Sequence, residues 1–247
     1  MDSVYLYDKY GETISHDLWN NLCRLIEWVC KHWQTADEGI WEVRGGRHHF
    51  LYSRLMCWVA IDRAVRLAWK RSLPAPFDRW IAVRSAIHHD IHHGFWNEHR
   101  RTFVQVKGGS AVDASCLLMP LMRFIGPTDP RWLSTLAAVE QDLVFDSLVY
   151  RYQGDAAVSD GLEGREGTFT MCSFWYVECL ARAGQLGKAR LAFDKMLGFA
   201  NHVGLYAEEL GAEGEHLGNF PQAFTHLGLI SAAYYLDRAL SGAGQRG

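Results

Sequence analysis

The stretch CWVAIDRAVRLA at residues 57–68 decides the fold, because its apolar residues recur at helical spacing and make a continuous stripe. Two later stretches share its texture of an aromatic or small residue, then an Ala and an Arg on one face. They are FWYVECLARAG at 174–184 and ISAAYYLDRAL at 230–240. Helical hairpins of this kind cannot each bury their own face, so they must stack in a ring or solenoid. The sequence therefore predicts an all-α protein with two layers of helices.

The same periodicity continues along the chain, and alternating strand patterns are nearly absent. Between His16 and Trp33 the apolar residues make one stripe, and further helices are expected near residues 50–71, 76–93, 113–125, 130–142, 169–184, 187–200 and 220–241. The segments DEGIWEVRGGRHH, QVKGGSAVDAS and YQGDAAVSDGLEGREG suit long functional loops above a rigid scaffold. No segment is rich enough in Pro, Ser or charge to divide the chain, so residues 1–247 are interpreted as one domain.

Composition narrows the classes of partner. The 25 basic and 28 acidic residues nearly balance, which argues against binding to nucleic acid or to an anionic membrane surface and favours a small neutral ligand. The absence of a leader-like segment and of a long apolar run predicts a cytoplasmic protein without a membrane span. The six cysteines include no CxxC pair and are expected to be reduced core thiols. A homo-oligomer is left open.

Two loops place carboxylates beside aromatic residues at the ends of apolar helices. In DEGIWEVRGG, Glu42 follows Trp41, and partial burial against the indole would suit a general acid. In GLYAEEL, Glu208 and Glu209 are adjacent and point in different directions, so at most one is expected to face a shared pocket. A glutamate in a loop is more often a solvated surface charge than a catalyst. Neither loop by itself indicates an enzyme.

Six stretches, in their order along the chain, resemble glycoside hydrolase family 15, the family of glucoamylases and trehalases. They are GIWEVRGG, LMCWVAIDRAVRLA, SLVYRY, EGTFTMCSFWYVECLARAG, GLYAEEL and GNFPQAFTHLGLISAA, and the resemblance covers nearly the whole chain. It implies an (α/α)6 toroid, a ring of paired helices with the substrate pocket in the loops at one end. It also implies hydrolysis of α-glucosidic bonds with inversion, by a mechanism that requires no metal and no organic cofactor.

The family's motifs imply roles for individual residues. The glutamate after the Trp of the first loop is the general acid, which corresponds to Glu42. The glutamate after the small residue of the late loop is the general base, which corresponds to Glu208. Trp41 resembles the aromatic wall beside the cleaved sugar, and Arg151 resembles the arginine that binds sugar hydroxyls. Further substrate contacts are expected from Arg44, Glu166 and Glu209.

Two departures from the family concern substrate and activity. Val43 stands where fungal glucoamylases have a second acidic residue, so the chain resembles the prokaryotic branch, and starch is in doubt as the substrate. Trehalose and maltooligosaccharides both remain open, because they present the same terminal glucosyl unit. Family members carry a β-sandwich and several toroid helices before the segment that aligns with Met1. We therefore expect a truncated reading frame, an incomplete toroid and little or no turnover by this chain alone.

Four histidines in the run HHDIHH make two pairs one helical turn apart, His88 with His92 and His89 with His93. That spacing suits a transition metal, although a polar helix end is the preferred interpretation. Glu166 either lines the pocket or interacts with the dipole of the helix that follows it.

Several aromatic and turn residues have structural interpretations. Trp58, Trp175 and Tyr176 lie on apolar helices and are expected in the core. Residues 219–222 are expected to shape the turn into the last helix rather than to contact sugar, because Pro is favoured at a first helical position.

Two alternatives to a hydrolase remain. One is a non-catalytic helical-hairpin scaffold that binds a protein partner, and the other is a pseudoenzyme fragment that associates with its complementary half. The scaffold hypothesis predicts that the loops at residues 37–46 and 204–210 lie far apart, whereas the hydrolase hypothesis predicts that they face one pocket.

Overall fold

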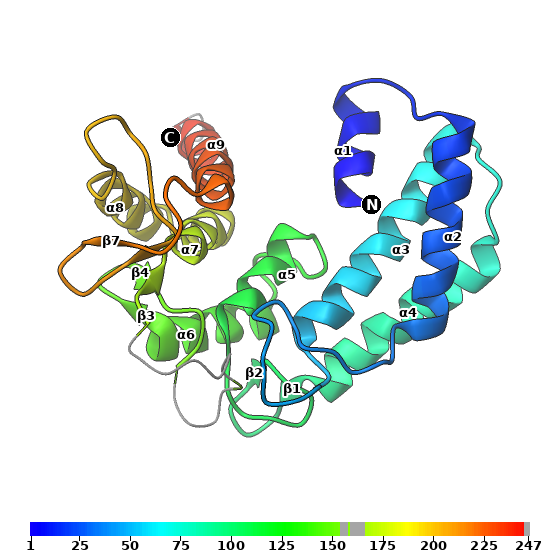
Figure 1. Cartoon of the computed structure of the whole chain (residues 1–247), viewed down its shortest axis with the longest axis horizontal. Coiled ribbons are helices and arrows are strands. Elements are labelled where there is room, and N and C mark those ends of the chain that lie inside the picture. Colours follow the sequence, from blue (N-terminus) through cyan, green and yellow to red (C-terminus); the bar gives the residue numbers. More distant parts are fainter. Residues whose placement is uncertain (154–157, 159–165, 245–247) are drawn as a thin grey trace.

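The computed structural model describes residues 1–153, 158 and 166–244, in which long helices alternate with short paired strands (Figure 1). The helices are α1 (Asp2–Tyr10), α2 (His16–His32), α3 (Leu51–Arg71), α4 (Phe77–Gly94), the 3-10 turn η1 (Ala114–Leu117), α5 (Leu118–Leu121), α6 (Pro130–Leu143), α7 (Thr170–Arg182), α8 (Leu186–Leu197) and α9 (Ala223–Gly244). The strands are β1 (Trp96–Asn97), β2 (Thr102–Phe103), β3 (Val144–Phe145), β4 (Leu148–Val149), β5 (Thr168–Phe169), β6 (Glu209–Leu210) and β7 (His216–Leu217). All strand pairs are antiparallel, as β1 with β2, β3 with β4, and the sheet β5-β6-β7.

Local sequence explains several helix ends. The Ser15 hydroxyl accepts the backbone N–H of Leu18 at 3.2 Å and so caps the first turn of α2. Asp129 caps α6 in the same way, by accepting the N–H of Arg131 at 2.8 Å, and Pro130 takes the first helical position. α2 and α6 thus begin where a side chain replaces a missing backbone partner.

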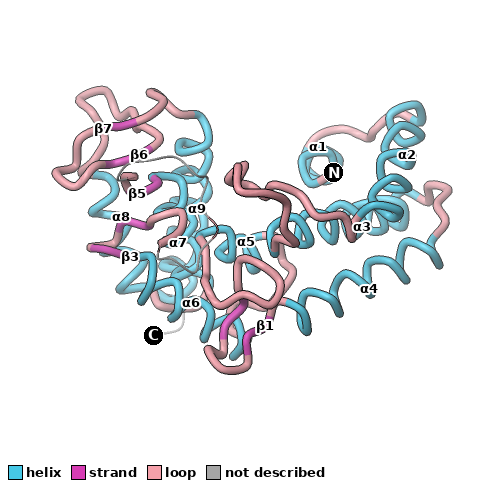
Figure 2. The backbone as a smooth tube through the Cα atoms, turned by 60° about the horizontal axis from the view of Figure 1, so that its bottom comes forward, coloured by secondary structure: helices cyan, strands magenta, loops and turns pink. Residues whose placement is uncertain are grey.

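The helices form two layers wound into an open arc (Figures 1 and 2). α1, α3, η1 with α5, α7 and α9 contact one another in series and make the inner layer, while α2, α4, α6 and α8 lie outside them. α3 and α7 bury residues on most of their surface, as inner helices must, whereas α2 buries only a stripe made by Trp19, Leu22, Ile26 and Cys30.

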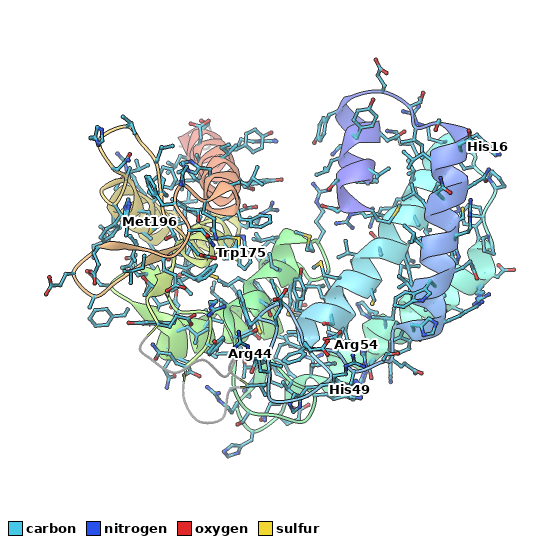
Figure 3. The ribbon with its side chains drawn as sticks, viewed as in Figure 1. His16, Arg44, His49, Arg54, Trp175 and Met196 are labelled. Carbon is cyan, nitrogen blue, oxygen red and sulfur yellow. The ribbon has the colours of Figure 1, made fainter. Side chains whose placement is uncertain are left out.

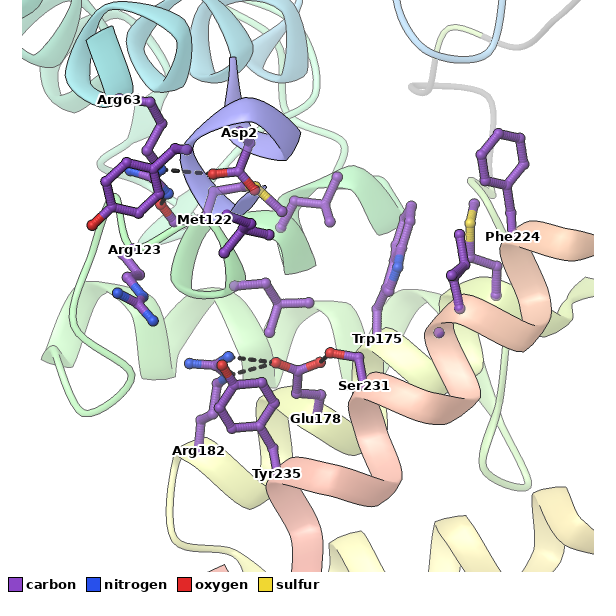
Figure 4. Close-up of a pocket in the computed structure, with 17 residues that line it drawn as sticks. Asp2, Arg63, Met122, Arg123, Trp175, Glu178, Arg182, Phe224, Ser231 and Tyr235 are labelled. Carbon is purple, nitrogen blue, oxygen red and sulfur yellow. Dashed lines mark hydrogen bonds and ion pairs between the residues drawn. The ribbon is translucent and has the colours of Figure 1, made fainter. Parts of the chain in front are cut away.

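The arc is open between α1 and α9 (Figure 1). A cavity of about 380 Å³ lies on this side, with walls from α1, α3, α5, α7 and α9. Four of its charged groups form pairs within the walls, Asp2 with Arg63 and Glu178 with Arg182, and Glu178 also accepts the Ser231 hydroxyl at 2.6 Å (Figure 4). Arg123 also lines this cavity. Along α9, the exposed large apolar side chains include Phe224, Leu227, Ile230 and Tyr234.

The all-α prediction is confirmed, and the predicted helices are present with their ends shifted by a few residues, except near residues 113–125. There the structure has the 3-10 turn η1 and the four-residue α5 in place of one continuous helix. The sequence pattern does not predict α1, because this helix docks through a charge rather than through an apolar stripe. Its Asp8 is buried and pairs with Lys70 at 2.7 Å and Arg71 at 2.8 Å on α3. Burial is the largest single effect and raises the pKa of Asp8, but the hydrogen bonds and charges of Lys70 and Arg71 together outweigh it, so the pKa is lowered.

The cysteines, the polarity of the helices and the third predicted loop bear on the remaining structural predictions. All six cysteines are free; Cys30, Cys116, Cys172 and Cys179 are buried, and burial raises the pKa of Cys57 to about 11. Across residues 1–153, 158 and 166–244, every helix is too short or too polar to cross a bilayer. Of the third predicted functional loop, positions 154–157 and 159–165 lie outside the described residues.

The histidine pairs lie on α4 as predicted, with ring centroids 4.3 Å apart for His88 and His92 and 3.9 Å apart for His89 and His93. His92 accepts a hydrogen bond from Arg131 at 3.1 Å, and its pKa is lowered to about 4, chiefly by burial and then by His88 and Arg131. No cluster of three metal-binding side chains occurs in the described part of the chain. The contacts of His92 favour the structural interpretation.

Candidate active site

One cavity collects side chains from five separate parts of the chain. It encloses about 510 Å³ and is lined by Ile40, Trp41, Glu42, Tyr52, Leu118, Arg151, Phe169, Met171, Trp175, Glu208, Gln222 and Phe224. The helical contributors lie in the first turns of α3, α5, α7 and α9, apart from Trp175 in the second turn of α7. Inner helices run in the same direction, so their N-termini gather at one end of the arc, where the positive ends of their dipoles favour carboxylates. Glu42 and Glu208 are the two carboxylates of this lining.

Glu42 lies in a tight turn between α2 and α3. The turn is closed by backbone bonds between Asp37 and His48 at 2.9 and 3.0 Å, and by the bond from Val43 N–H to the Glu38 carbonyl at 3.0 Å. Within it Glu42 has a φ of 53°, a left-handed conformation that costs a residue with a side chain about 1–3 kcal/mol. Such strain at a carboxylate that faces a cavity indicates a functional position.

The expected burial of Glu42 against Trp41 is wrong, since the Glu42 side chain is exposed. The left-handed turn explains this result. It sends Trp41 and Val43, which are 7% and 2% exposed, into the core, while the residue between them points out into the open cavity.

Glu208 lies immediately before β6, where the chain is bonded on both sides. Its carbonyl accepts the N–H of Thr170 at 2.9 Å, and its N–H donates to the carbonyl of Asn219 at 3.0 Å. The carboxylate accepts two further bonds from Asn219, from the backbone N–H at 3.0 Å and from Nδ2 at 2.8 Å. Gly218 has a φ of 70°, and a Cβ there would lie 2.7 Å from the Glu208 carboxylate, so this position requires glycine.

Arg151 is the cation among the described residues that line the cavity. Its guanidinium lies 5.4 Å from the ring centroid of Trp41, 5.1 Å from that of Phe169 and 5.3 Å from that of Tyr152. It also forms an ion pair with Glu166. Three aromatic faces and one carboxylate therefore hold the guanidinium in place at the wall of the cavity.

The structure brings together four of the seven predicted site residues, namely Glu42, Glu208, Trp41 and Arg151. Glu166 lies one step away, in contact with Arg151 and at the edge of a neighbouring cavity of about 540 Å³. The ion pair with Arg151 favours a role for Glu166 beside the pocket over the alternative of an interaction with the dipole of α7.

Arg44 and Glu209 do not line the cavity. Arg44, which Figure 3 labels, is exposed and follows the left-handed residue Glu42 by two positions. The loop at residues 37–46 that carries both is called the acid loop below. Glu209 lies in β6 and its carboxylate accepts the N–H of Gly167 at 3.2 Å, because alternate residues of a strand point to opposite faces. The expectation that only one of two adjacent glutamates faces the pocket is confirmed, with Glu208 as that residue.

Several residues that line the cavity are not predicted as site residues by the sequence. Trp58 and Tyr176 are core residues as predicted, but Trp175 is only half-buried and contributes to the cavity (Figure 3). Gln222 lines the cavity as well as shaping the turn, where it accepts the Thr225 hydroxyl at 2.7 Å. Their position in the helix is the signal that could have identified the others. Each lies in the first turn of an inner helix, as Tyr52, Leu118, Met171 and Phe224 do.

The loops at residues 37–46 and 204–210 contribute to the same cavity. The expectation from the scaffold hypothesis, that they lie far apart, is therefore wrong. The arrangement offers two carboxylates, an aromatic wall and a fixed guanidinium around one space, a set suited to a small polyhydroxylated ligand.

The chain is similar in sequence to a family of glycosyl hydrolases and to proteins named trehalase. Residues 1–234 match glycosyl hydrolases family 15. The chain is 46% identical over 241 residues to a trehalase of Mycobacterium tuberculosis, which covers 97% of this chain and 35% of that protein. It is 36% identical over 239 residues to a trehalase of Thermoplasma acidophilum, which covers 96% of this chain and 40% of that protein. The chain thus spans between a third and two fifths of the length of these relatives.

Solved structures show the same fold. A bacterial glucoamylase complexed with acarbose superimposes with a TM-score of 0.76 at 16% identity, covering 94% of this chain and 39% of that one. A glucoamylase from Hypocrea jecorina gives a TM-score of 0.72 at 13% identity, covering 96% of this chain and 50% of that one. These likenesses confirm the expected incomplete toroid of helices.

Proposed function

Because this chain belongs to glycosyl hydrolase family 15, which matches residues 1–234, we propose that it hydrolyses a terminal α-glucosidic bond with inversion. In this proposal Glu42 is the general acid and Glu208 is the general base. Trp41 forms the wall against the cleaved sugar, and Arg151 binds its hydroxyls. Residues 1–247 act as one partial catalytic domain.

The observation that carries the proposal is that Glu42 and Glu208 line the same cavity from loops at opposite ends of the sequence. Its volume of about 510 Å³ falls within the range of about 300–1,000 Å³ that is usual for small-molecule sites. The apolar faces of Trp41, Phe169 and Trp175 suit the faces of sugar rings, while the carboxylates and the guanidinium suit hydroxyl groups.

The two glutamates divide the reaction between them. Protonated Glu42 donates to the glycosidic oxygen as the C–O bond breaks, while ionised Glu208 takes a proton from a water that attacks the anomeric carbon from the other face. A water fits between base and sugar when the two carboxyls lie about 6.5–9.5 Å apart. The bonds from Asn219 support this role, because they orient the Glu208 carboxylate before substrate arrives.

For the substrate we propose α,α-trehalose first and short maltooligosaccharides second. The proteins at 46% and 36% identity are both named trehalase. Trehalose and a maltooligosaccharide present the same terminal glucosyl unit, so the groups around Glu42, Glu208 and Arg151 serve either. The leaving group distinguishes them, and Gln222 and Phe224 at the start of α9 are available to contact it.

The test follows the anomers formed from trehalose by ¹H NMR with the full 247-residue chain, at high protein concentration and over long incubation, because we expect turnover by this chain alone to be slow. Inversion yields equal initial amounts of α- and β-glucose, because the attacked ring inverts and the departing ring keeps its configuration. The variants Glu42→Gln and Glu208→Gln should lose about 10²-fold or more in kcat. Glu213→Gln, in the exposed turn between β6 and β7 and outside the cavity, is the matched control and should keep the parent rate.

Three results would overturn the proposal. Formation of α-glucose alone would exclude inversion, and a Glu42→Gln variant as fast as its parent would remove the assigned acid. A chain that hydrolyses neither trehalose nor maltotriose after prolonged incubation would remove the activity from this polypeptide, although its membership of the family would stand.

A further inference from the structure

Asp113 is a buried carboxylate that lies behind the cavity rather than in it. It is 1% exposed and precedes η1, between two buried apolar neighbours. Its Oδ2 accepts the indole N–H of Trp41 at 2.7 Å, and its Oδ1 accepts the Ser115 hydroxyl at 2.7 Å. The two oxygens therefore serve different parts of the molecule, one the acid loop and the other the start of η1.

Burial of a carboxylate in this position is unfavourable unless its oxygens are bonded. Burial raises the pKa of Asp113, and the bonds from Ser115, Trp41 and Cys116 oppose that rise. An apolar residue would avoid the cost, but it would leave the Trp41 indole N–H buried without an acceptor. The carboxylate is thus matched to the Trp41 donor.

The backbone around Asp113 ties a second part of the site to the same point. Asp113 and Tyr152 form an antiparallel bridge, and the Ala114 N–H donates to the carbonyl of Arg151 at 2.8 Å. Since the Arg151 guanidinium also lies 5.4 Å from the Trp41 ring, the acid loop and the arginine segment meet at Asp113.

The left-handed turn at Glu42 needs such an anchor. A strained conformation persists only when the surrounding structure over-determines it, and Trp41 is the residue that immediately precedes the strain. The Trp41 ring packs against Phe169 at 6.0 Å and Tyr152 at 6.5 Å, but packing alone permits the indole to slide or rotate. The bond to Asp113 fixes its orientation as well as its depth.

We propose that Asp113 is a positioning residue, which holds the Trp41 indole and thereby keeps Glu42 in its left-handed turn facing the cavity. The role of Glu42 as the acid rests on the proposed function. The coupling of Asp113 to Trp41 and to the turn does not depend on that function. Asp113 touches no substrate in this proposal and acts through Trp41.

Hydrogen exchange in the full chain tests the coupling directly. The probes are the Trp41 indole N–H and the Val43 amide N–H, which donates to Glu38 within the turn. In Asp113→Ala both should exchange about tenfold faster or more, because the buried acceptor of the indole N–H has been lost. Ser115→Ala is the matched control, since it removes a bond to the other oxygen of the same carboxylate, and it should change both rates by less than about twofold.

Asp113→Asn covers the case in which the alanine variant does not fold. Its amide offers one acceptor oxygen in place of two, so both probes should exchange about threefold faster or more, between the control and the alanine variant. Equal exchange at Trp41 and Val43 in Asp113→Asn and Ser115→Ala would overturn the proposal. So would a rise that appears equally in amides of α8, because it would indicate general loosening.

Turnover of trehalose adds a readout that separates this proposal from the proposed function. If the parent chain is active, Asp113→Asn should lower kcat about tenfold while KM changes less than about twofold, because the substrate wall remains while the acid is displaced. An unchanged kcat with faster exchange at Trp41 would refute positioning of the acid. A parent without turnover would contradict the proposed function, and the exchange measurements would still decide the coupling.

Discussion

The segment that carries Glu208 leads into a three-stranded sheet, whereas the loop that carries Glu42 is a strained turn next to Trp41, whose indole is bonded to the buried Asp113. Around Glu208, four hydrogen bonds link its backbone and carboxylate to Thr170 and Asn219. The Glu42 carboxylate is exposed, and the closest fixed point of its loop is the Trp41 indole, bonded to Asp113.

The difference shows two ways to hold a reacting group. Glu208, the proposed base, is oriented by direct contacts to its own carboxylate from Asn219. Glu42, the proposed acid, is exposed, and its position is set by the left-handed conformation of its backbone. A base that must hold a small water benefits from direct fixation. An acid that must follow a departing oxygen tolerates more freedom.

The largest expected effect separates the two groups by chemistry. With trehalose, Glu42→Gln and Glu208→Gln should each lower kcat about 10²–10⁴-fold. With α-glucosyl fluoride, whose leaving group departs without protonation, Glu42→Gln should lose less than about tenfold, because the acid is not needed. Glu208→Gln should lose as much with the fluoride as with trehalose, since water must still be activated.

Release of fluoride, followed with an ion-selective electrode, provides the measurement. If Glu42→Gln lost activity equally on both substrates, Glu42 would not be the acid. If Glu208→Gln recovered on the fluoride, the two assignments would have to be exchanged.

The helical scaffold is predictable from the sequence, and the exceptions have physical reasons. Apolar residues at three- and four-residue steps reveal α3 and α7 because these helices bury most of their surface. The same periodicity reveals α9, although its large apolar side chains, such as Leu227 and Ile230, are exposed. Two-residue strands such as β5 and β6 are too short to show alternation, so the sheet that fixes Glu208 has no sequence signal of its own. The sequence does not predict α1, because the ion pairs of Asp8 with Lys70 and Arg71 take the place of an apolar stripe.

The candidate site is predictable only where a motif carries it. Resemblance to the family identifies Glu42, Glu208, Trp41 and Arg151, which the structure places on one cavity. Trp175 reads as a core residue because its helix is apolar on most sides, and only the tertiary arrangement leaves it half-buried at the cavity. Arg44 is adjacent to the motif in sequence, but the left-handed turn separates its side chain from the cavity.

An intermediate effect is expected where the base loop is tightest. In Gly218→Ala the new Cβ would lie 2.7 Å from the Glu208 carboxylate and 3.1 Å from its Cβ, which forces the base to move. A displacement of about 1 Å can lower turnover about 10²-fold, and we expect a loss of about 10–100-fold in kcat. The left-handed φ adds a cost of about 1–2 kcal/mol to folding.

Gly204→Ala is the control for this backbone cost. Gly204 has a φ of 78° in the segment before β6, but nothing lies within 4 Å of a Cβ placed there. Both variants should lose similar free energy of unfolding in urea, and only Gly218→Ala should lose kcat. A similar loss of kcat in both would mean that the loop as a whole, rather than contact with Glu208, sets the rate.

The smallest effect is expected when a single bond to the base is removed. Asn219→Ala deletes the Nδ2 donor at 2.8 Å but keeps the backbone N–H at 3.0 Å, so Glu208 retains one of its two partners. One bond to a charged group is worth about 1.5–3 kcal/mol when buried, and less at this exposed position. We therefore expect kcat on trehalose to fall about three- to tenfold, with little change in KM.

Asn201→Ala is the comparison that gives this result its meaning. The Asn201 carboxamide accepts the N–H groups of Val203 and Leu205 at 3.0 and 2.8 Å, so it stabilises the same loop without touching Glu208. It should lower the unfolding midpoint in urea while kcat stays within about twofold of the parent. If Asn201→Ala reduced kcat as much as Asn219→Ala, the base would depend on the order of its whole loop. The contrast with the acid, which is held through one neighbour, would then disappear.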